Sequence, residues 1–228
     1  LWLRIFTAPE LSGAVLFLGL PMSVIPEAVT KPCIYQNPLI IGGREYVIES
    51  DKTGRILDGN RLWPVSVAIA QIVAGIPIDE LPFGREVTVC AVGDGLGLPG
   101  IVAASRGAVP VVVERDPRLW EFIHRNYVAN QVWGRFRPFS WSEVIDVFDC
   151  AVGSEIIYPG FGMSELCKFI DRCWNRKLPC YFGASSDCGS DEFMSELETY
   201  KISVRRRLHD FQLPDGSVGV CYLWELTP

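Results

Sequence analysis

The chain lacks several features that would assign it to a class at once. Its eight cysteines form no C-x-x-C pair and only two histidines accompany them, so we predict neither a disulfide framework nor a metal site. No run of about eighteen apolar residues occurs, which argues against a transmembrane helix and a membrane partner. The net charge of −6 is the opposite of the basic excess typical of general nucleic-acid binding.

The chain does have enough apolar residues for a substantial core. Its 228 residues and 49% hydrophobic content predict one α/β domain with a small appendage. The cysteines lie in apolar runs, so we expect small buried side chains in a reducing intracellular compartment. The chain starts at Leu1 rather than at a methionine, so we expect an upstream piece. A targeting peptide there would imply the mitochondrion, and otherwise we expect the cytoplasm.

The pattern of apolar and polar residues divides the chain into three segments. Residues 1–37 form an apolar N-terminal arm whose stretch LSGAVLFLGLPMSVIP needs a partner surface. Residues 38–61 predict a β-hairpin around Gly42 and Gly43. Residues 62–228 alternate between strand-like and helix-like runs and end in two strands, KISVRRRLHDF and SVGVCYLWELT, whose connection is too short for a crossover helix. The fold class is therefore α/β, with a mostly parallel sheet and a C-terminal antiparallel hairpin.

The stretch VTVCAVGDGLGLPG, residues 87–100, predicts a strand, a tight turn and a helix start. Gly95, Gly97 and Gly100 fit the G-x-G-x-x-G pattern of dinucleotide-binding proteins, whereas Gly93, Gly95 and Gly97 fit the G-x-G-x-G turn of S-adenosylmethionine enzymes. Glycines let the backbone approach a ligand closely, and free N–H groups at a helix start attract an anionic group. A purely structural turn is the alternative interpretation.

The two strands at the C-terminus help to distinguish a dinucleotide-binding domain from an S-adenosylmethionine-binding one. A nicotinamide-binding domain would continue with βα units, whereas a parallel sheet closed by a hairpin is the plan of class I methyltransferases. Open α/β sheets bind ligands beyond the carboxyl ends of their strands. We therefore expect the site around residues 93–97, Glu114, Trp141 and residues 154–158.

Five motifs from about Leu62 to the C-terminus belong together: RLWPVSVAIAQIV, VCAVGDGLGLPGIVAA, VVVERDPRLWEFIHRNYVAN with Asn126 and Asn130, FSW, and FDCAVGSEIIY. In these motifs the chain resembles the seven-β-strand, or class I, S-adenosylmethionine-dependent methyltransferases that modify lysine, or occasionally histidine, on proteins. The resemblance implies a doubly wound, Rossmann-like sheet of seven strands.

The resemblance implies roles for individual residues. Glu114 would accept hydrogen bonds from both ribose hydroxyls of the cofactor, and Trp141 would lie against its adenine. The backbone of the glycine turn would hold the methionine end, Ser154 would line the cofactor site, and Trp63 would form a wall of it. The turn residues concerned are Gly93, Asp94, Gly95 and Gly97. Core packing or a helix start explains each of the side chains equally well when it is taken singly.

Glu155 and Tyr158 would orient the incoming amine, and the resemblance implies no metal. Two departures from the family pattern bear on activity: Ala91 stands where the family has glutamate, and Glu155 stands where it has aspartate. The first removes a contact worth about 1.5 to 3 kcal/mol, for which Asp94 could substitute from a shifted position.

Two main hypotheses therefore remain open from the sequence. One is a protein N-methyltransferase that acts on lysine or histidine; the other is a catalytically inactive, methyltransferase-like structural or assembly subunit of a larger complex such as a ribonucleoprotein particle. A nicotinamide-dependent oxidoreductase is a weaker third. The expected partner is a protein substrate or a multi-subunit complex engaged through the N-terminal arm. For the basic run Arg205–Arg207 an exposed strand edge is favoured over an RNA contact, which the net charge does not indicate.

Overall fold

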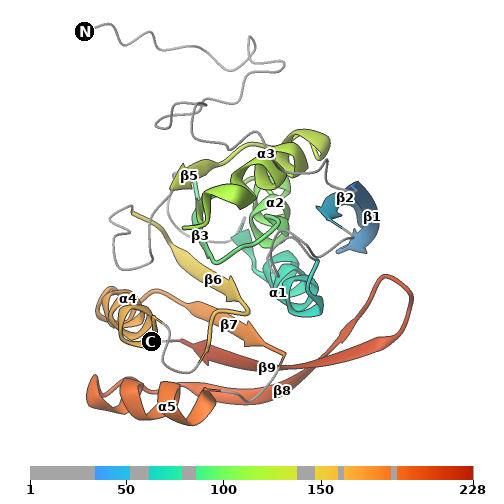
Figure 1. The fold of residues 1–228 in the computed structure, drawn as a ribbon. Coiled ribbons are helices and arrows are strands. Elements are labelled where there is room, and N and C mark those ends of the chain that lie inside the picture. Colours follow the sequence, from blue (N-terminus) through green and yellow to red (C-terminus); the bar gives the residue numbers. More distant parts are fainter. Residues whose placement is uncertain are drawn as a thin grey trace, which may run out of the picture.

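The structure is a computed structural model that describes residues 34–51, 62–78, 86–137, 147–158, 162–185 and 189–227. Figure 1 shows a twisted sheet with helices on both of its faces. The predicted N-terminal arm falls almost entirely outside the described residues, and so does Trp141. The apolar stretch at residues 11–26 is also outside them.

Seven strands form the main sheet in the order β5-β4-β3-β6-β7-β9-β8. The strands are β3 (Thr88–Val92), β4 (Val109–Val113), β5 (Arg135–Arg137), β6 (Cys150–Ser154), β7 (Cys180–Ala184), β8 (Arg205–Gln212) and β9 (Val218–Leu226). The ladders from β5 to β7 are all parallel, whereas β9 pairs antiparallel with both β7 and β8. This confirms the predicted mostly parallel, seven-stranded sheet with a C-terminal antiparallel hairpin.

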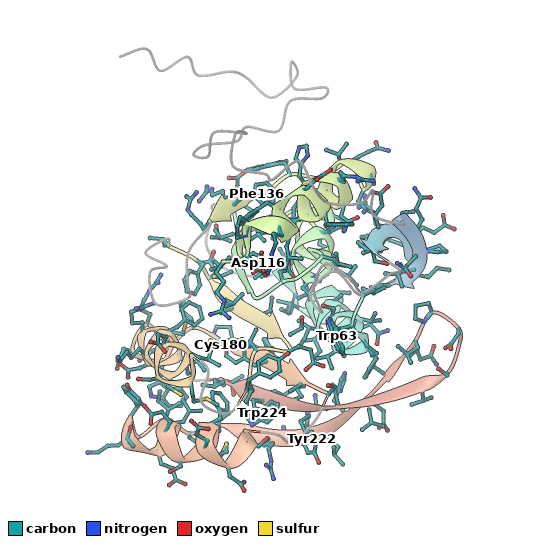
Figure 2. All side chains as sticks on the ribbon, in the orientation of Figure 1. Trp63, Asp116, Phe136, Cys180, Tyr222 and Trp224 are labelled. Atoms are coloured by element: carbon teal, nitrogen blue, oxygen red, sulfur yellow. The ribbon has the colours of Figure 1, made fainter. Side chains whose placement is uncertain are left out.

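Helices cover the sheet in two layers because its central strands are apolar on both faces. Helices α1 (Pro64–Gly75), α2 (Leu98–Ser105) and α3 (Trp120–Ala129) pack on one face, and α4 (Met163–Asn175) and α5 (Ser190–Thr199) pack on the other. In β3, Val89 and Ala91 join the first core and Cys90 and Val92 the second. Trp224 of β9, labelled in Figure 2, is fully buried. Its ring meets that of Phe193 in α5 edge to face, with the ring centroids 6.0 Å apart.

The predicted hairpin before the main domain is present as a separate two-stranded sheet. Strand β1 (Ile34–Ile41) pairs antiparallel with β2 (Arg44–Asp51), so the first strand begins four residues before the predicted segment 38–61. Gly42 and Gly43 join them with φ values of 58° and 78°. Two consecutive positive φ angles are what a two-residue type I′ turn requires. The hairpin lies beside α3 (Figure 1).

Local sequence signals explain where the elements begin. Helix α2 starts at Leu98, and Pro99 is tolerated in its first turn because the N–H that proline lacks would have no partner within the helix. Strand β8 starts at Arg205 rather than at Lys201, whose φ of 57° is incompatible with an extended strand. No helix within the described ranges is long and apolar enough to cross a membrane.

Candidate active site

The glycine turn after β3 has a backbone that side chains would not tolerate. Gly93, Gly95 and Gly97 have φ values of 59°, 58° and 90°, a region that costs other residues about 1 to 2 kcal/mol each. A Cβ atom on Gly93 would lie 2.3 Å from Cγ2 of Ile156. The turn is closed by a hydrogen bond of 2.9 Å from Gly97 N to Asp94 O, so the N–H groups of the two residues between them are not consumed in closing it.

Glu114 follows β4, the strand next to β3 in the sheet, and is 8% exposed. Its Oε1 atom accepts a hydrogen bond of 2.9 Å from Asp116 N, which fixes the carboxylate close to its own backbone. Burial raises the pKa of Glu114 above its ordinary value of 4.5, an effect that the Asp116 bond partly opposes. Because β3 and β4 are parallel and adjacent, the Glu114 carboxylate and the glycine turn both follow the carboxyl ends of these strands, on the same side of the sheet's strand ends.

Asp94 lies in the turn, but its side chain is directed into the protein. The residue is 1% exposed, and its Oδ2 atom accepts a hydrogen bond of 3.3 Å from Gly100 N in the first turn of α2. Burial raises the pKa of Asp94 well above its ordinary value of 3.8; the Gly100 bond opposes this, and the charge of Glu114 adds to it. One oxygen of Asp94 is therefore engaged within the fold and the other is buried without a hydrogen-bond partner among the described residues, while Ala91 is fully buried in β3.

Replacing Asp94 by asparagine should stabilise the protein at neutral pH. In the wild type the folded state retains a proton on Asp94 at pH values where the unfolded chain has lost it, so the free energy of unfolding falls as pH rises. We expect Asp94→Asn to raise that free energy by about 1 to 3 kcal/mol near pH 7, and by less near pH 4, where Asp94 of the unfolded chain is already partly protonated. Urea unfolding of both proteins at the two pH values checks this, and a difference independent of pH would contradict it.

A second group of predicted residues lies at and after the carboxyl end of β6, the strand that pairs with β3 on its other side. Ser154, 5% exposed, shares a hydrogen bond of 2.9 Å with the hydroxyl of Ser66 in α1. Glu155 has a φ of 54°, which is unusual for a residue with a side chain. Its N–H donates to Gly183 O at 2.8 Å, and its Oε1 atom accepts from Ser185 N at 3.0 Å. Such strain persists only where surrounding contacts enforce it, and it is common at functional sites.

The aromatic residues of the predicted site are less buried. Tyr158 is 46% exposed, beyond the buried pair Ile156 and Ile157. Trp63 is half-buried and immediately precedes α1, where Figure 2 labels it. Trp141 lies outside the described residues, so its predicted contact with adenine stays a prediction.

The structure thus places the glycine turn, Glu114 and residues 154–158 after the carboxyl ends of β3, β4 and β6, with β3 between the other two strands. Trp63 lies before α1 and not after a strand, and the roles predicted for all these residues stay predictions. Sequence reasoning missed Ser66, because only the fold shows that it faces Ser154. It also predicted no hydrogen-bond partner for Asn126, although this residue belongs to the motif VVVERDPRLWEFIHRNYVAN. The described residues contain no cluster of three or more histidine, cysteine or acidic side chains placed to hold a metal ion.

Comparison with known proteins gives evidence at the level of the fold. No family model and no curated protein matches the sequence. Among solved structures, a S-adenosylmethionine-dependent methyltransferase from Agrobacterium tumefaciens superposes with a TM-score of 0.60 at 14% identity, covering 89% of this chain and 72% of that one. Magnesium protoporphyrin IX methyltransferase from Synechocystis, with bound S-adenosylmethionine, gives 0.51 at 13% identity over 71% and 79%.

A third similar structure is a tRNA (uracil-54, C5)-methyltransferase from Pyrococcus abyssi in complex with S-adenosylhomocysteine, with a TM-score of 0.53 at 16% identity. The match covers 84% of this chain and 44% of that one. The chain therefore has the class I fold of S-adenosylmethionine-dependent methyltransferases, as its sequence motifs predict. The substrates of these proteins differ, a tetrapyrrole in one case and a tRNA base in another, so the shared fold does not identify an acceptor.

Proposed function

We propose that this protein binds S-adenosylmethionine and transfers its methyl group to a nitrogen atom of a protein side chain, lysine or histidine. The observation that carries the cofactor assignment is the pairing of the glycine turn with the buried Glu114 at the ends of two adjacent parallel strands. The chemistry of these groups fits the cofactor, because a carboxylate accepts from two ribose hydroxyls and turn N–H groups bind a carboxylate.

When bound, S-adenosylmethionine supplies an electrophilic methyl group whose transfer leaves a neutral thioether. The residues of this chain then have to align the acceptor and keep its nitrogen unprotonated, which is catalysis mainly by positioning. Glu155 is suited to the first task because its backbone N–H is bonded to Gly183 O and its side-chain Oε1 atom is held by Ser185 N. Tyr158 is exposed enough to touch an incoming side chain.

Assignment to a protein acceptor rests on the sequence motif from residue 154 to 158, and a transfer assay tests it. We expect methyl-labelled S-adenosylmethionine to label protein in an extract, with the label recovered as methyl-lysine or methyl-histidine after hydrolysis. Protein carrying Glu114→Ala should label far less than the wild type at the same cofactor concentration. Label recovered in nucleic acid would contradict the protein acceptor.

One set of observations favours the inactive structural subunit as a second candidate. Ala91 has no carboxylate to offer, the Asp94 carboxyl group is engaged with Gly100, and one oxygen of Glu155 is bound to Ser185. This candidate predicts that the protein co-purifies in a stable complex whose assembly is unaffected by Gly95→Arg. A free monomer with robust turnover would exclude it.

A further inference from the structure

Two asparagines four residues apart, Asn126 in the last turn of α3 and Asn130 directly after the helix, hold the β1–β2 hairpin by bonding to its backbone as a neighbouring strand would. The amide of Asn130 accepts from Val47 N at 3.0 Å and donates to Val47 O at 2.7 Å. The amide of Asn126 accepts from Glu49 N at 2.7 Å and donates to Glu49 O at 3.2 Å. Both therefore satisfy the N–H and C=O groups on the same edge of β2, two residues apart.

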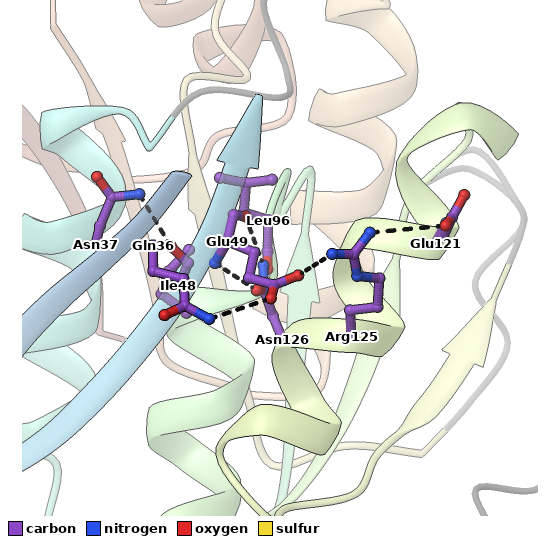
Figure 3. Close-up of polar contacts among 8 residues, drawn as sticks. All are labelled: Gln36, Asn37, Ile48, Glu49, Leu96, Glu121, Arg125 and Asn126. Atoms are coloured by element: carbon purple, nitrogen blue, oxygen red, sulfur yellow. Dashed lines mark hydrogen bonds and ion pairs between the residues drawn. The ribbon is translucent and has the colours of Figure 1, made fainter. Parts of the chain in front are cut away.

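The third hydrogen bond of each amide distinguishes the two. Asn130 donates to Asn126 O at 2.8 Å, in the last turn of α3. Asn126 instead donates to Leu96 O at 2.9 Å, and Leu96 lies inside the glycine turn (Figure 3). Asn126 is 0% exposed, so no water competes for this bond. A single buried side chain thus joins the hairpin to the turn.

The Leu96 carbonyl is a sensitive point of the turn because a peptide unit is planar. Its C=O group and the N–H of Gly97 belong to the same plane and point in opposite directions. Asn126 holds one end of this plane, and Asp94 O holds the other through Gly97 N at 2.9 Å. Without the Asn126 bond, the peptide plane between Leu96 and Gly97 can rotate. The direction in which the neighbouring N–H groups point then changes as well.

We propose that Asn126 is a positioning residue, which transmits the docking of the β1–β2 hairpin to the glycine turn and thereby sets the affinity for the cofactor. The effect on affinity rests on the proposed function, whereas the effect on the turn does not. The hairpin has an independent attachment at the same point, since Arg125 pairs with Glu49 at 2.6 Å (Figure 3). Loss of the Asn126 amide should therefore loosen the turn without releasing the hairpin.

The test compares Asn126→Ala with Asn130→Ala, which is a matched control because each variant loses one amide with two bonds to β2. We expect the dissociation constant for S-adenosylhomocysteine to rise about 10- to 100-fold in Asn126→Ala and less than about threefold in Asn130→Ala. Amide hydrogen exchange in the unliganded proteins is the second readout. Exchange at Gly97 should accelerate only in Asn126→Ala, whereas exchange at β2 should accelerate in both.

Equal loss of affinity in the two variants, or unchanged exchange at Gly97 in Asn126→Ala, would overturn the proposal. If the wild type does not bind S-adenosylhomocysteine, the proposed function fails, and exchange at Gly97 still decides whether Asn126 positions the turn. Should Asn126→Ala not fold, Asn126→Leu gives the same comparison. Leucine has a similar shape to asparagine but has no N–H to donate to Leu96 O, so exchange at Gly97 should again accelerate.

Discussion

Gly93→Ala should lose about 2 to 5 kcal/mol of folding free energy and at least about 100-fold of its affinity for S-adenosylmethionine. Its φ of 59° penalises any Cβ by about 1 to 2 kcal/mol, and the new methyl group would lie 2.3 Å from the buried Ile156. Relief of that overlap must shift the turn or the segment after β6, and a displacement of about 1 Å is enough to cost about 100-fold in a positioned site. Urea unfolding and calorimetric titration measure the two effects.

Gly107→Ala is the matched control for this variant. Gly107 also has a left-handed φ, 90°, but a Cβ there would meet nothing within 4 Å. Its cost should be limited to the backbone penalty of about 1 to 2 kcal/mol, with cofactor affinity unchanged. If Gly93→Ala bound the cofactor as tightly as Gly107→Ala does, the turn after β3 would not be part of the site.

Glu114→Gln should weaken S-adenosylmethionine binding about 10- to 100-fold near pH 7.5, because a charge-assisted acceptor for the ribose hydroxyls is replaced by an amide. The amide oxygen can still accept from Asp116 N, so the local backbone should be retained. Since burial raises the pKa of Glu114, wild-type affinity should decrease as pH falls, beginning at a higher pH than for an exposed glutamate. Titrations at several pH values measure both effects.

The affinity of Glu114→Gln for S-adenosylmethionine should not decrease further at low pH, because glutamine does not titrate. Glu121→Gln removes the same charge from an exposed position on α3 and should leave both affinity and its pH dependence unchanged. Equal affinities for wild type and Glu114→Gln across the pH range would show that this carboxylate does not contact the cofactor.

The sequence was sufficient to predict the elements whose signals are local. Buried strands such as Val109–Val113 appear as continuous apolar runs, and the pair Gly42 and Gly43 predicted the first hairpin. The short connection before Val218 predicted the antiparallel end of the sheet, and that feature separated a methyltransferase fold from a nicotinamide-binding one.

Contacts between distant segments could not be predicted in this way. The hydroxyl pair of Ser66 and Ser154 joins residues 88 positions apart, and the Asn126 bond to Leu96 depends on where α3 docks. The inward direction of the Asp94 side chain follows from the path of α2 rather than from residue type. Helical and strand periodicity shows which face of an element is buried, but not which polar group lies opposite it.

The central claim is that the turn after β3 and the carboxylate after β4 hold S-adenosylmethionine. Calorimetric titration of the wild-type protein with S-adenosylmethionine tests it most directly, with Glu114→Gln titrated in parallel. We predict saturable binding of one cofactor per chain, with a dissociation constant below about 1 mM and a weaker constant for the variant. The absence of any binding heat up to millimolar cofactor, from protein shown to be folded, would contradict it.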